Sequence, residues 1–512
     1  GIGAFLLHIV LSRLIRTQRD QIAILKAFGY GNWQIGEHFL KLLLVIVAIG
    51  AMIGVGVGSW LGSALTQLYV EFYKFPLLRY QVSPAMAIVA ILMSGSAAIA
   101  GAFGSVKAAV SLPPAEAMRP EPPAQFRRTL VERFGLQRWL SPVGRIILRN
   151  LERKPIQSML STIGIALAVA MLIVGRYSYD AIDYMIDVQF GRIQRDDVTV
   201  LFNEPRPGRT RYEVAHLPGV LYAEPFRSVP VRLRFGHRSQ RIGIMGLSPF
   251  SELYQLLDQH LNGVDLPLDG VLLTRKLGEM LGVSAGDRLT VEVLEGSRPT
   301  RTITVAGLVD ELLGISAYMD IQALNQLMQE GATISGAYLA VDEQQVDQLY
   351  SLMKRTPAIA SISLRKVMLQ RFQETIARSQ GIMTLIQVIF ACVIAFGVVY
   401  NAARIALSER SRELATLRII GFTRAQIAVI LLGEQAILTL AAIPLGFALG
   451  YGLAALLSLT YNTELYRFPL IVTKASYGFA FVVIGIAATL SGWLVRRQSD
   501  RLDLIAVLKS RE

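Results

Sequence analysis

Cysteine, histidine and the common catalytic loops are scarce or absent in this 512-residue sequence. Its one cysteine, Cys392, lies within an apolar run, so neither a disulfide framework nor a cysteine-based metal site can form within the chain. The five histidines show no spacing typical of metal ligands. The sequence also lacks a GxxxxGK(S/T) phosphate loop, a GxSxG elbow and an HExxH motif, so ATP hydrolysis and the common hydrolase activities cannot be assigned to it. We expect a protein that is not an enzyme and holds no cofactor or metal.

Charged residues are also few, at 17% of the chain, and their sign is unbalanced, with a formal net charge of +13. A basic protein can bind nucleic acid, but here the arginines and lysines gather in particular loops and not on one soluble face. The positive-inside rule places such loops in the cytoplasm, and we therefore expect no nucleic-acid partner. The basic loops are 13–38, 107–155, 406–428 and 496–512, and the loops poor in basic residues are 67–83 and 460–474.

Apolar residues are abundant, at 53% of the sequence, with a mean hydropathy of +0.44. They are clustered into runs long enough to cross a bilayer, which needs roughly 20 residues per helix. The sequence predicts an α-helical polytopic membrane protein with about seven transmembrane helices in two repeats. The predicted spans are 39–66, 85–108, 156–176, 382–406, 429–459 and 475–495, and residues 1–12 are expected to be the end of another.

The segment 180–381 joins a helix that leaves the cytoplasm to one that returns, so we expect it to form an extracytoplasmic domain. Gly286 and Asp287 are a turn signal before the alternating strand RLTVEV, and TITVAGLV reads as another strand. Residues 247–260, 272–281 and 320–330 have helical spacing. The domain is therefore expected to be mixed α/β.

An internal repeat relates the two ends of the chain. One constant offset aligns Leu25 with Leu417, Gly29 with Gly421 and Gln34 with Gln426, and it continues into the membrane helices. At this offset residue 1 corresponds to residue 393, which lies well inside the first helix of the second copy. We therefore expect the parent polypeptide to contain an earlier helix. The glycines expected to allow close helix packing are Gly50, Gly54, Gly58 and Gly62 in the first copy and Gly446 and Gly450 in the second.

The segment ERSRELATLRIIGFTRAQI, residues 409–427, is a charged helical pattern between two apolar stretches. Leu414, Leu417 and Ile420 lie on one face of the predicted helix, and charged residues surround them. This ridge has two readings: it rests on the lipid surface as an amphipathic helix, or it inserts into a groove of a cytoplasmic partner.

The same segment contains its own stop and start signals. Gly421 is placed as a left-handed C-cap glycine, and Thr423 is placed as the N-cap of the helix that follows. The sequence therefore predicts a compact helix-turn-helix, and TQRDQIAILKAFGYGNWQI at 17–35 has the same layout.

ERSRELATLRIIGFTRAQI and the following LLGEQAILTLAAIPLGFALG closely resemble the coupling segment and next helix of FtsX-like permeases, the membrane subunits of the MacB and lipoprotein-releasing class of ABC transporters. The first copy, RDQIAILKAFGYGNWQI, resembles a more diverged version. LPLDGVLLTRKLGEMLGVSAGDRLTVEV and RTITVAGLVDELLGISAYMDIQALNQL resemble the extracytoplasmic core domain of such permeases. The resemblance covers nearly the whole chain.

The resemblance implies a partner, a cytoplasmic ABC ATPase that works as a dimer and binds ATP and magnesium, and whose closure pushes on both coupling segments. The first copy departs from the family's charged pattern, with Gln21 at the position of Glu413. One expected docking surface comprises Glu413, Leu414, Leu417, Arg418 and Gly421. The other comprises Ile22, Leu25, Lys26 and Gly29.

Two charged residues fall close to the membrane. Glu434 lies about one turn inside a predicted membrane helix, where it would pair with Arg404 or Arg410 or, in a sharper reading, carry protons. The first copy has Leu42 at the equivalent position, which argues against a shared role. Arg176 at the outer membrane edge leaves the same alternatives open.

The resemblance implies a permease of the bacterial inner (plasma) membrane that exports or extracts a substrate. The helices offer few polar groups, which favours a lipid-like, lipoprotein or hydrophobic substrate that interacts with membrane lipid, and an outer protein partner is possible in this class. The alternative is a sensing permease that transmits ATPase motion to an envelope hydrolase or a peptide response without transport. The expected domains are the first repeat 1–121, a basic linker 122–155, a transmembrane helix 156–179, the outer domain 180–381 and the second repeat 382–512.

Overall fold

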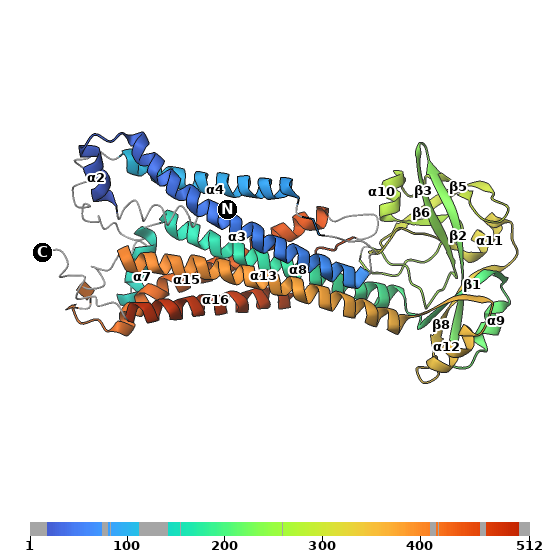
Figure 1. Cartoon of the computed structure of the whole chain (residues 1–512). Helices are drawn as coiled ribbons and strands as arrows, with labels where there is room; N and C mark the ends of the chain where they lie inside the picture. The colour runs from blue at the N-terminus through green and yellow to red at the C-terminus, as the bar shows by residue number, and fades with distance from the viewer. Residues whose placement is uncertain are drawn as a thin grey trace. The chain divides into compact units, whose positions relative to one another are not determined.

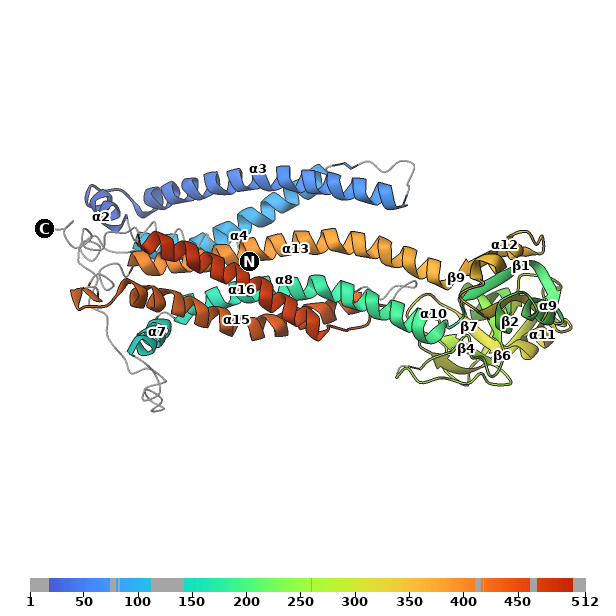
Figure 2. The same cartoon turned by 90° about the horizontal axis from the view of Figure 1, so that it is seen from below.

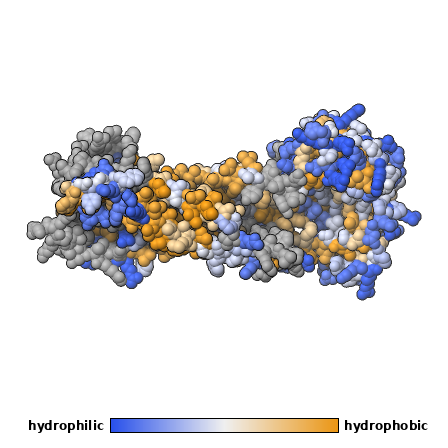
Figure 3. Space-filling view, turned by 45° about the horizontal axis from the view of Figure 1, so that its top comes forward, coloured by the Kyte–Doolittle hydropathy of each residue, from blue (hydrophilic) through white to orange (hydrophobic). Residues whose placement is uncertain are grey.

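The computed structural model describes residues 18–73, 80–81, 83–111, 142–153, 155–258, 260–409, 416–417, 419–460 and 467–500. The chain divides into two compact units. The membrane unit comprises Gly1–Ile173, Leu385–Tyr451 and Tyr477–Glu512, and the outer unit comprises Val174–Thr384 and Gly452–Ser476. Apolar side chains gather over the long helices and hydrophilic ones over the strands, as Figure 3 shows.

Long apolar helices form where the sequence predicts them (Figure 1). The helices outside the outer domain are α2 (Arg19–Ala27), α3 (Asn32–Tyr73), α4 (Pro84–Ser111), α7 (Pro142–Arg153), α8 (Pro155–Asp187), α13 (Arg365–Glu409), α15 (Arg424–Thr460) and α16 (Lys474–Asp500). In the described part of the chain, five are long and apolar enough to cross a membrane, and α4 has a shorter apolar stretch, Pro84–Ala100. The helix end expected at 1–12 lies outside the described residues.

Helices α8 and α15 approach each other closely at two glycines. A Cβ at Gly446 would lie 2.5 Å from the Val169 Cβ and 2.8 Å from the Ala166 carbonyl oxygen, and one at Gly450 would lie 2.7 Å from the Ile173 Cβ. Without these glycines the two backbones would have to separate. The close packing expected at Gly446 and Gly450 is therefore present.

The glycines of the first copy have different surroundings. A Cβ at Gly62 would meet the Tyr80 ring at 2.5 Å. A Cβ at Gly50, Gly54 or Gly58 would meet no atom of the described residues within 4 Å, apart from the backbone of its own helix. Helix α3 packs on α4 through Leu43, Val47 and Ala98 instead. In the apolar window of α3 only 6% of the residues are buried, compared with 56% for α8. For those three glycines close packing stays a prediction.

Helices α13, α15 and α16 meet in one apolar cluster near the start of α15. Ala403, Leu407, Ile427, Leu431 and Val495 are its buried members. Both views show α8, α13, α15 and α16 running side by side (Figures 1 and 2). The second repeat and α8 thus form a packed helix bundle.

The outer unit contains the strands and the short helices between α8 and α13. Its strands are β1 (Val198–Pro207), β2 (Val220–Phe235), β3 (Arg238–Leu247), β4 (Val271–Thr274), β5 (Arg288–Val293), β6 (Thr300–Val309), β7 (Ala317–Asp320), β8 (Thr333–Val341) and β9 (Ile359–Leu364). Its helices are α9 (Thr210–Ala215), α10 (Arg275–Leu281), α11 (Ile321–Met328) and α12 (Val346–Lys354), and the π-helical turn η2 (Val188–Ile193) follows α8. The expected mixed α/β domain is confirmed.

The sheet order is β3-β7-β4-β6-β5-β2-β8-β1-β9, and β3 also pairs with β2. This extra pairing closes β2, β3, β7, β4, β6 and β5 into a barrel, whose interior is filled by residues such as Val231, Leu233, Ile244 and Leu273. The first half of β2 continues with β8, β1 and β9 as an antiparallel sheet. Strand β2 therefore belongs to both halves of the outer domain.

A buried arginine lies on β2 between these halves. Arg227 is 1% exposed, and its guanidinium donates to Ser335 at 2.9 Å, to Glu330 at 3.1 Å and to Glu295. Ser335 belongs to β8 and Glu295 follows β5, so the arginine ties the sheet to the barrel. Removing both Glu295 and Glu330 would leave the buried guanidinium charge without a carboxylate partner among the described residues.

The prediction of a helix at 247–260 is wrong. The backbone of this segment bonds to the chain after α8, with Arg195 N donating to the Leu253 carbonyl and Gln255 N donating to the Ile193 carbonyl. Its apolar side chains, including Tyr254 and Leu257, are buried in a cluster with Val188 and Ile193. Their spacing imitates a helix, but long-range pairing determines the backbone. Residues 272–281 are likewise strand β4 before helix α10 starts, whereas the helix expected at 320–330 is present as α11.

This apolar cluster also contains a carboxylate. Glu311 is 7% exposed, and Tyr318 donates to it at 2.8 Å while Tyr254 lies at 3.5 Å. Burial raises the pKa of Glu311, and hydrogen bonds from Tyr318, Ser316 and Tyr254 oppose that rise. The folded protein therefore holds a proton on Glu311 at pH values where the unfolded chain has released it.

We expect Gly446→Val to weaken the packing of α8 on α15, because its Cβ would meet the backbone and side chains of α8. Overpacking of this kind costs about 1–3 kcal/mol. Thermal unfolding of the detergent-solubilised chain should show a lower midpoint for Gly446→Val. The matched control is Gly54→Val, at the equivalent repeat position, which should leave the midpoint unchanged. Equal midpoints for the two variants would contradict the packing.

We expect Glu311→Gln to change how stability depends on pH. In the wild type the native pKa is raised above the ordinary value of 4.5, so the native state binds more protons than the unfolded state between these two pKa values. The free energy of unfolding should therefore fall as pH rises from about 4.5 through the native pKa. Glutamine does not titrate, so the variant should lose this decline.

The measurement is the unfolding midpoint of both proteins from about pH 4.5 to about pH 8, taken as the difference between variant and wild type. Glu343→Gln is the control, because the Glu343 side chain is 90% exposed. If the difference in unfolding midpoint between Glu311→Gln and the wild type is constant across this pH range, Glu311 does not hold a proton in the native state.

Candidate coupling elements

The second copy of the charged element ends in a left-handed glycine. Gly421 has φ 109°, and the chain before it closes with hydrogen bonds from Ile420 N to the Thr416 carbonyl at 3.0 Å and from Phe422 N to the Leu417 carbonyl at 3.0 Å. The second bond spans six residues, as in a Schellman C-cap. The predicted C-cap at Gly421 is confirmed.

The next helix, α15, starts with a reciprocal cap. Gln426 N donates to the Thr423 hydroxyl at 3.2 Å, and Thr423 N donates to the Gln426 side-chain oxygen at 2.9 Å. This is a capping box, which satisfies amide groups that otherwise have no partner at a helix start. The predicted N-cap at Thr423 is confirmed.

The first copy repeats most of this geometry. Gly29 has φ 91°, Tyr30 N donates to the Leu25 carbonyl at 3.1 Å, and Gly31 N donates to the Gln34 side-chain oxygen at 3.0 Å. Each bond matches one in the second copy at the repeat offset. Gly31 has no side chain, so only one half of the capping box is present. The two capped turns are therefore structural copies, and not merely similar in sequence.

Equivalent apolar side chains project from both turns. Phe28 is 80% exposed and Ile420, its equivalent, is 70% exposed, each immediately before the left-handed glycine. Ile419 is also 70% exposed, and Trp33 is 80% exposed at the start of α3. An apolar side chain held at a rigid turn is suited to contact a partner or a lipid surface.

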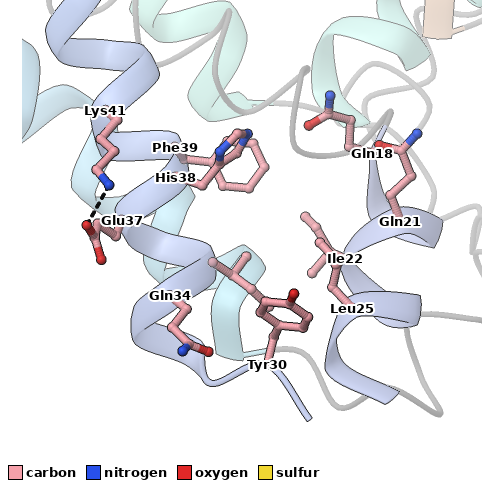
Figure 4. Close-up of a pocket in the computed structure, with 11 residues that line it drawn as sticks. Gln18, Gln21, Ile22, Leu25, Tyr30, Gln34, Glu37, His38, Phe39 and Lys41 are labelled. Carbon is pink, nitrogen blue, oxygen red and sulfur yellow. Dashed lines mark ion pairs between the residues drawn. The ribbon is translucent and has the colours of Figure 1, made fainter. Parts of the chain in front are cut away.

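A groove of about 440 Å³ runs between α2 and the start of α3 (Figure 4). Its buried floor is apolar, formed by Ile22, Ile35 and Phe39, and amide side chains such as Gln21 and Gln34 stand at its rim. Glu37 and Lys41 pair at 2.7 Å on the same helix. The groove combines apolar contact area with hydrogen-bonding groups, as a protein-binding groove does.

The predicted docking residues are distributed between surface and interior. Ile22 is buried at 5% exposure, Leu25 is 40% exposed and Lys26 is half-buried. Leu417 packs against the cluster formed by α13, α15 and α16. Glu413, Leu414 and Arg418 lie outside the described residues. The sequence pattern missed Phe28, Trp33 and Ile419, although each precedes or follows a cap signal and is large and apolar.

The charged residue expected inside the membrane is buried. Glu434 is 8% exposed on α15, with Gln435 and Thr439 buried beside it, whereas Leu42 in the first copy is 38% exposed. Arg404, one of its expected partners, is exposed, and Arg410 lies outside the described residues. The role of Glu434 stays a prediction.

Arg176 belongs to a polar cluster at the outer end of the helices. Its guanidinium lies 4.6 Å from the centre of the Tyr179 ring, and its Nε lies 3.4 Å from the Ser476 hydroxyl. Ser476 in turn donates to Asp180 at 2.6 Å. Arg176 thus has local partners. In the described part of the chain, no group of three or more His, Cys, Asp or Glu residues could hold a metal ion.

The membrane segments match a known family. Residues 1–114 and 385–502 each match the model of the FtsX-like permease C-terminal region. These two segments are the two repeats that carry the capped turns at Gly29 and Gly421. Sequence relatives include the macrolide export ATP-binding/permease protein MacB of Escherichia coli O157:H7, of Escherichia coli K12 and of Shigella flexneri.

Each of these relatives is 24% identical to the chain over 406 residues, which is 73% of this chain and 61% of the relative. The chain thus spans about three fifths of the length of these relatives. Among solved structures, the periplasmic region of MacB from Actinobacillus actinomycetemcomitans is similar at 13% identity and a TM-score of 0.27, covering 36% of this chain and 96% of that one. The extracellular domain of the noncanonic ABC-type transporter YknZ from Gram-positive bacteria is similar at 13% identity and a TM-score of 0.25, covering 33% and 98%.

Both repeats match one family model, and both keep the same capped turn just before a membrane helix. A membrane protein with an extracytoplasmic α/β domain between two FtsX-like regions, this chain is similar to FtsX-like permeases in both of those regions.

Proposed function

We propose that this chain is the permease subunit of an ABC transporter and that a cytoplasmic ABC ATPase on a separate subunit drives it. The observation that carries the proposal is the duplicated coupling element, with matched hydrogen bonds at Gly29 and Gly421 and matched exposed side chains at Phe28 and Ile420. Two rigid copies in one chain provide two docking surfaces, one for each subunit of an ATPase dimer. The relatives named ATP-binding/permease proteins carry both functions, whereas this sequence has no phosphate loop.

The docking surface of the first element consists of Phe28, Trp33 and the groove between α2 and α3. That of the second element consists of Ile419 and Ile420. The Leu417 side chain packs against the apolar cluster of α13, α15 and α16, and in this way it stabilises the second turn. A change at Leu417 would therefore disturb folding as well as docking, and Ile420 is the better residue to test.

The proposed substrate is a lipid-like, lipoprotein or otherwise hydrophobic molecule in the bacterial inner membrane. The faces of α3 and α4 that lie open carry large apolar side chains, including Ile53, Trp60, Met86 and Leu92. Lateral entry from the bilayer suits such helices better than an aqueous path does. A sensing permease that moves no substrate would use the same coupling elements.

We expect Phe28→Asp and Ile420→Asp each to reduce co-purification of the ATPase with the full-length protein, and the double variant to abolish it. A carboxylate at the centre of an apolar contact costs at least about 2 kcal/mol, or roughly thirtyfold in affinity. The measurement is the ATPase content of the detergent-purified complex together with its ATP turnover.

Phe250→Asp is the matched control, since Phe250 is 89% exposed but lies in the outer unit. It should leave both the complex and ATP turnover unchanged. If the complex survives the double variant, the turns are lipid-surface elements and the ATPase proposal fails.

We expect the full-length complex in proteoliposomes to release a fluorescent lipid or lipopeptide in the presence of ATP, and the double variant to release none. A polar dye of similar size is the comparison. Release of the polar dye alone would contradict the proposed substrate class. ATP turnover and an ATP-driven change in the outer domain without release of any probe would favour the sensing permease.

A further inference from the structure

The loop between α15 and α16 is bound to the outer domain at its first described residue. Arg467 Nη1 lies 3.2 Å from Asp310 Oδ1, and Arg467 N donates to the Leu312 carbonyl at 3.1 Å. Asp310 also accepts from Arg275, the first residue of α10, whose guanidinium donates to both carboxylate oxygens at 3.1–3.2 Å. One carboxylate thus holds an arginine of the outer domain and an arginine of the helix loop.

The other end of the loop is bound to α8. Thr473 N and the Ser476 hydroxyl donate to the same oxygen of Asp180, at 2.8 and 2.6 Å. Asp180 is 5% exposed, so this contact is sheltered from water. The Thr473 hydroxyl also accepts from Ser476 N at 3.3 Å at the start of α16. The start of α16 is therefore anchored on α8.

The middle of the loop packs on the same helices. Phe468, Leu470 and Val472 lie against Tyr177 of α8 and its buried neighbours Ala181 and Ala454. The Ser458 hydroxyl of α15 donates to the Phe468 carbonyl at 2.8 Å. The described part of the loop, 467–473, is held at both of its ends and packed between them, so it would absorb little of a displacement of the helices that it contacts.

The Asp310–Arg467 contact differs from an ordinary surface ion pair. The two side chains are 19% and 16% exposed, and Arg467 Nε and Nη2 are buried with no hydrogen-bond partner among the described residues. Asp310 is the carboxylate that contacts this guanidinium in the described structure. A partly buried pair of this kind loses much of its favourable energy when either charge is removed.

We propose that Asp310 and Arg467 are the positioning pair through which a displacement of α15 reaches the outer domain. The inference rests on the proposed function, because it assumes that the ATPase displaces α15 at its capped end. Helix α15 is continuous from Arg424 to Thr460, a length of about 55 Å. The pair gives the outer domain an attachment to the loop after α15, besides its covalent continuation into α8 and α13.

The test uses the full-length protein with its ATPase in nanodiscs and measures a nucleotide-dependent distance. Spin labels are placed at Glu343→Cys in the outer unit and at Arg496→Cys near the end of α16, in a Cys392→Ser background. The distance distribution is recorded with and without a non-hydrolysable ATP analogue and magnesium. ATP turnover of the same sample is the second readout.

In the labelled protein without further changes, we expect the nucleotide to shift the distance between the two spin labels. Arg467→Met should lose most of that shift, while its ATP turnover stays within about twofold of that protein's. Arg467→Lys keeps the charge and should retain the shift. Asp310→Asn keeps the side-chain shape without the charge, so it should reduce the shift as Arg467→Met does. The matched control is Arg232→Met, which removes an ion pair with Glu292 within the barrel and should change neither readout.

A full shift in Arg467→Met or in Asp310→Asn would overturn the positioning role and leave the proposed function intact. Loss of ATP turnover together with the shift in Arg467→Met would also overturn it, because a positioning pair leaves docking unchanged. The absence of any bound ATPase from the wild type would instead refute the proposed function, and the positioning role with it.

Discussion

The close contact of α8 and α15 at Gly446 and Gly450 joins α8 to the second repeat. In a bilayer, lipid tails are as apolar as leucine, so helices gain little from hiding apolar surface and depend on close packing. Glycine allows that packing, because the Val169 and Ile173 side chains occupy the space that a Cβ would take. At its two ends α15 makes further contacts, with α13 and α16 near its start and with α8 again near its end.

The two repeats keep the same turn but not the same membrane surroundings. The capped turns at Gly29 and Gly421 depend on local hydrogen bonds, which any chain with these cap residues can form. Packing along the membrane helix depends on neighbouring helices, and there the copies differ. A Cβ at Gly446 would meet α8, whereas one at Gly54 would meet no described atom within 4 Å outside its own helix. The feature that both halves preserve is therefore the capped turn with its exposed apolar side chain.

Local features of the fold could be predicted from the sequence. Helix length and apolarity located the membrane helices, and the glycine at 421 and the threonine at 423 located the turn between two of them. Features that depend on distant parts of the chain could not be predicted. The segment containing Tyr254 and Leu257 has helical spacing, yet its backbone pairs with residues after α8.

The candidate docking surfaces show the same difference between local features, which could be predicted, and long-range contacts, which could not. The pattern selected Leu417 because it lies on an apolar face, but its side chain packs against the cluster of α13, α15 and α16, whereas Ile420 of the same predicted face is 70% exposed. Periodicity identifies an apolar stripe without showing whether it meets the protein's own core or a partner. The exposed Phe28 and Ile420 stand beside the cap glycines, where the chain reverses and side chains must leave the helix surface. Asp310 and Arg467 are far apart in sequence, and no motif links them.

The transmission proposed for α15 depends on its contact with α8, because α15 contains a proline. Pro444 has no amide hydrogen, so the helix lacks the bond that would join this residue to the carbonyl one turn earlier, and a helix bends most easily at such a point. Gly446 and Gly450 follow directly, where α8 packs against α15. This packing braces the helix just beyond its weak point, so in the proposed mechanism a push at the capped end would move α15 and α8 together. Both helices would then carry the displacement to the α15–α16 loop, α15 through the Ser458–Phe468 hydrogen bond and α8 through Asp180.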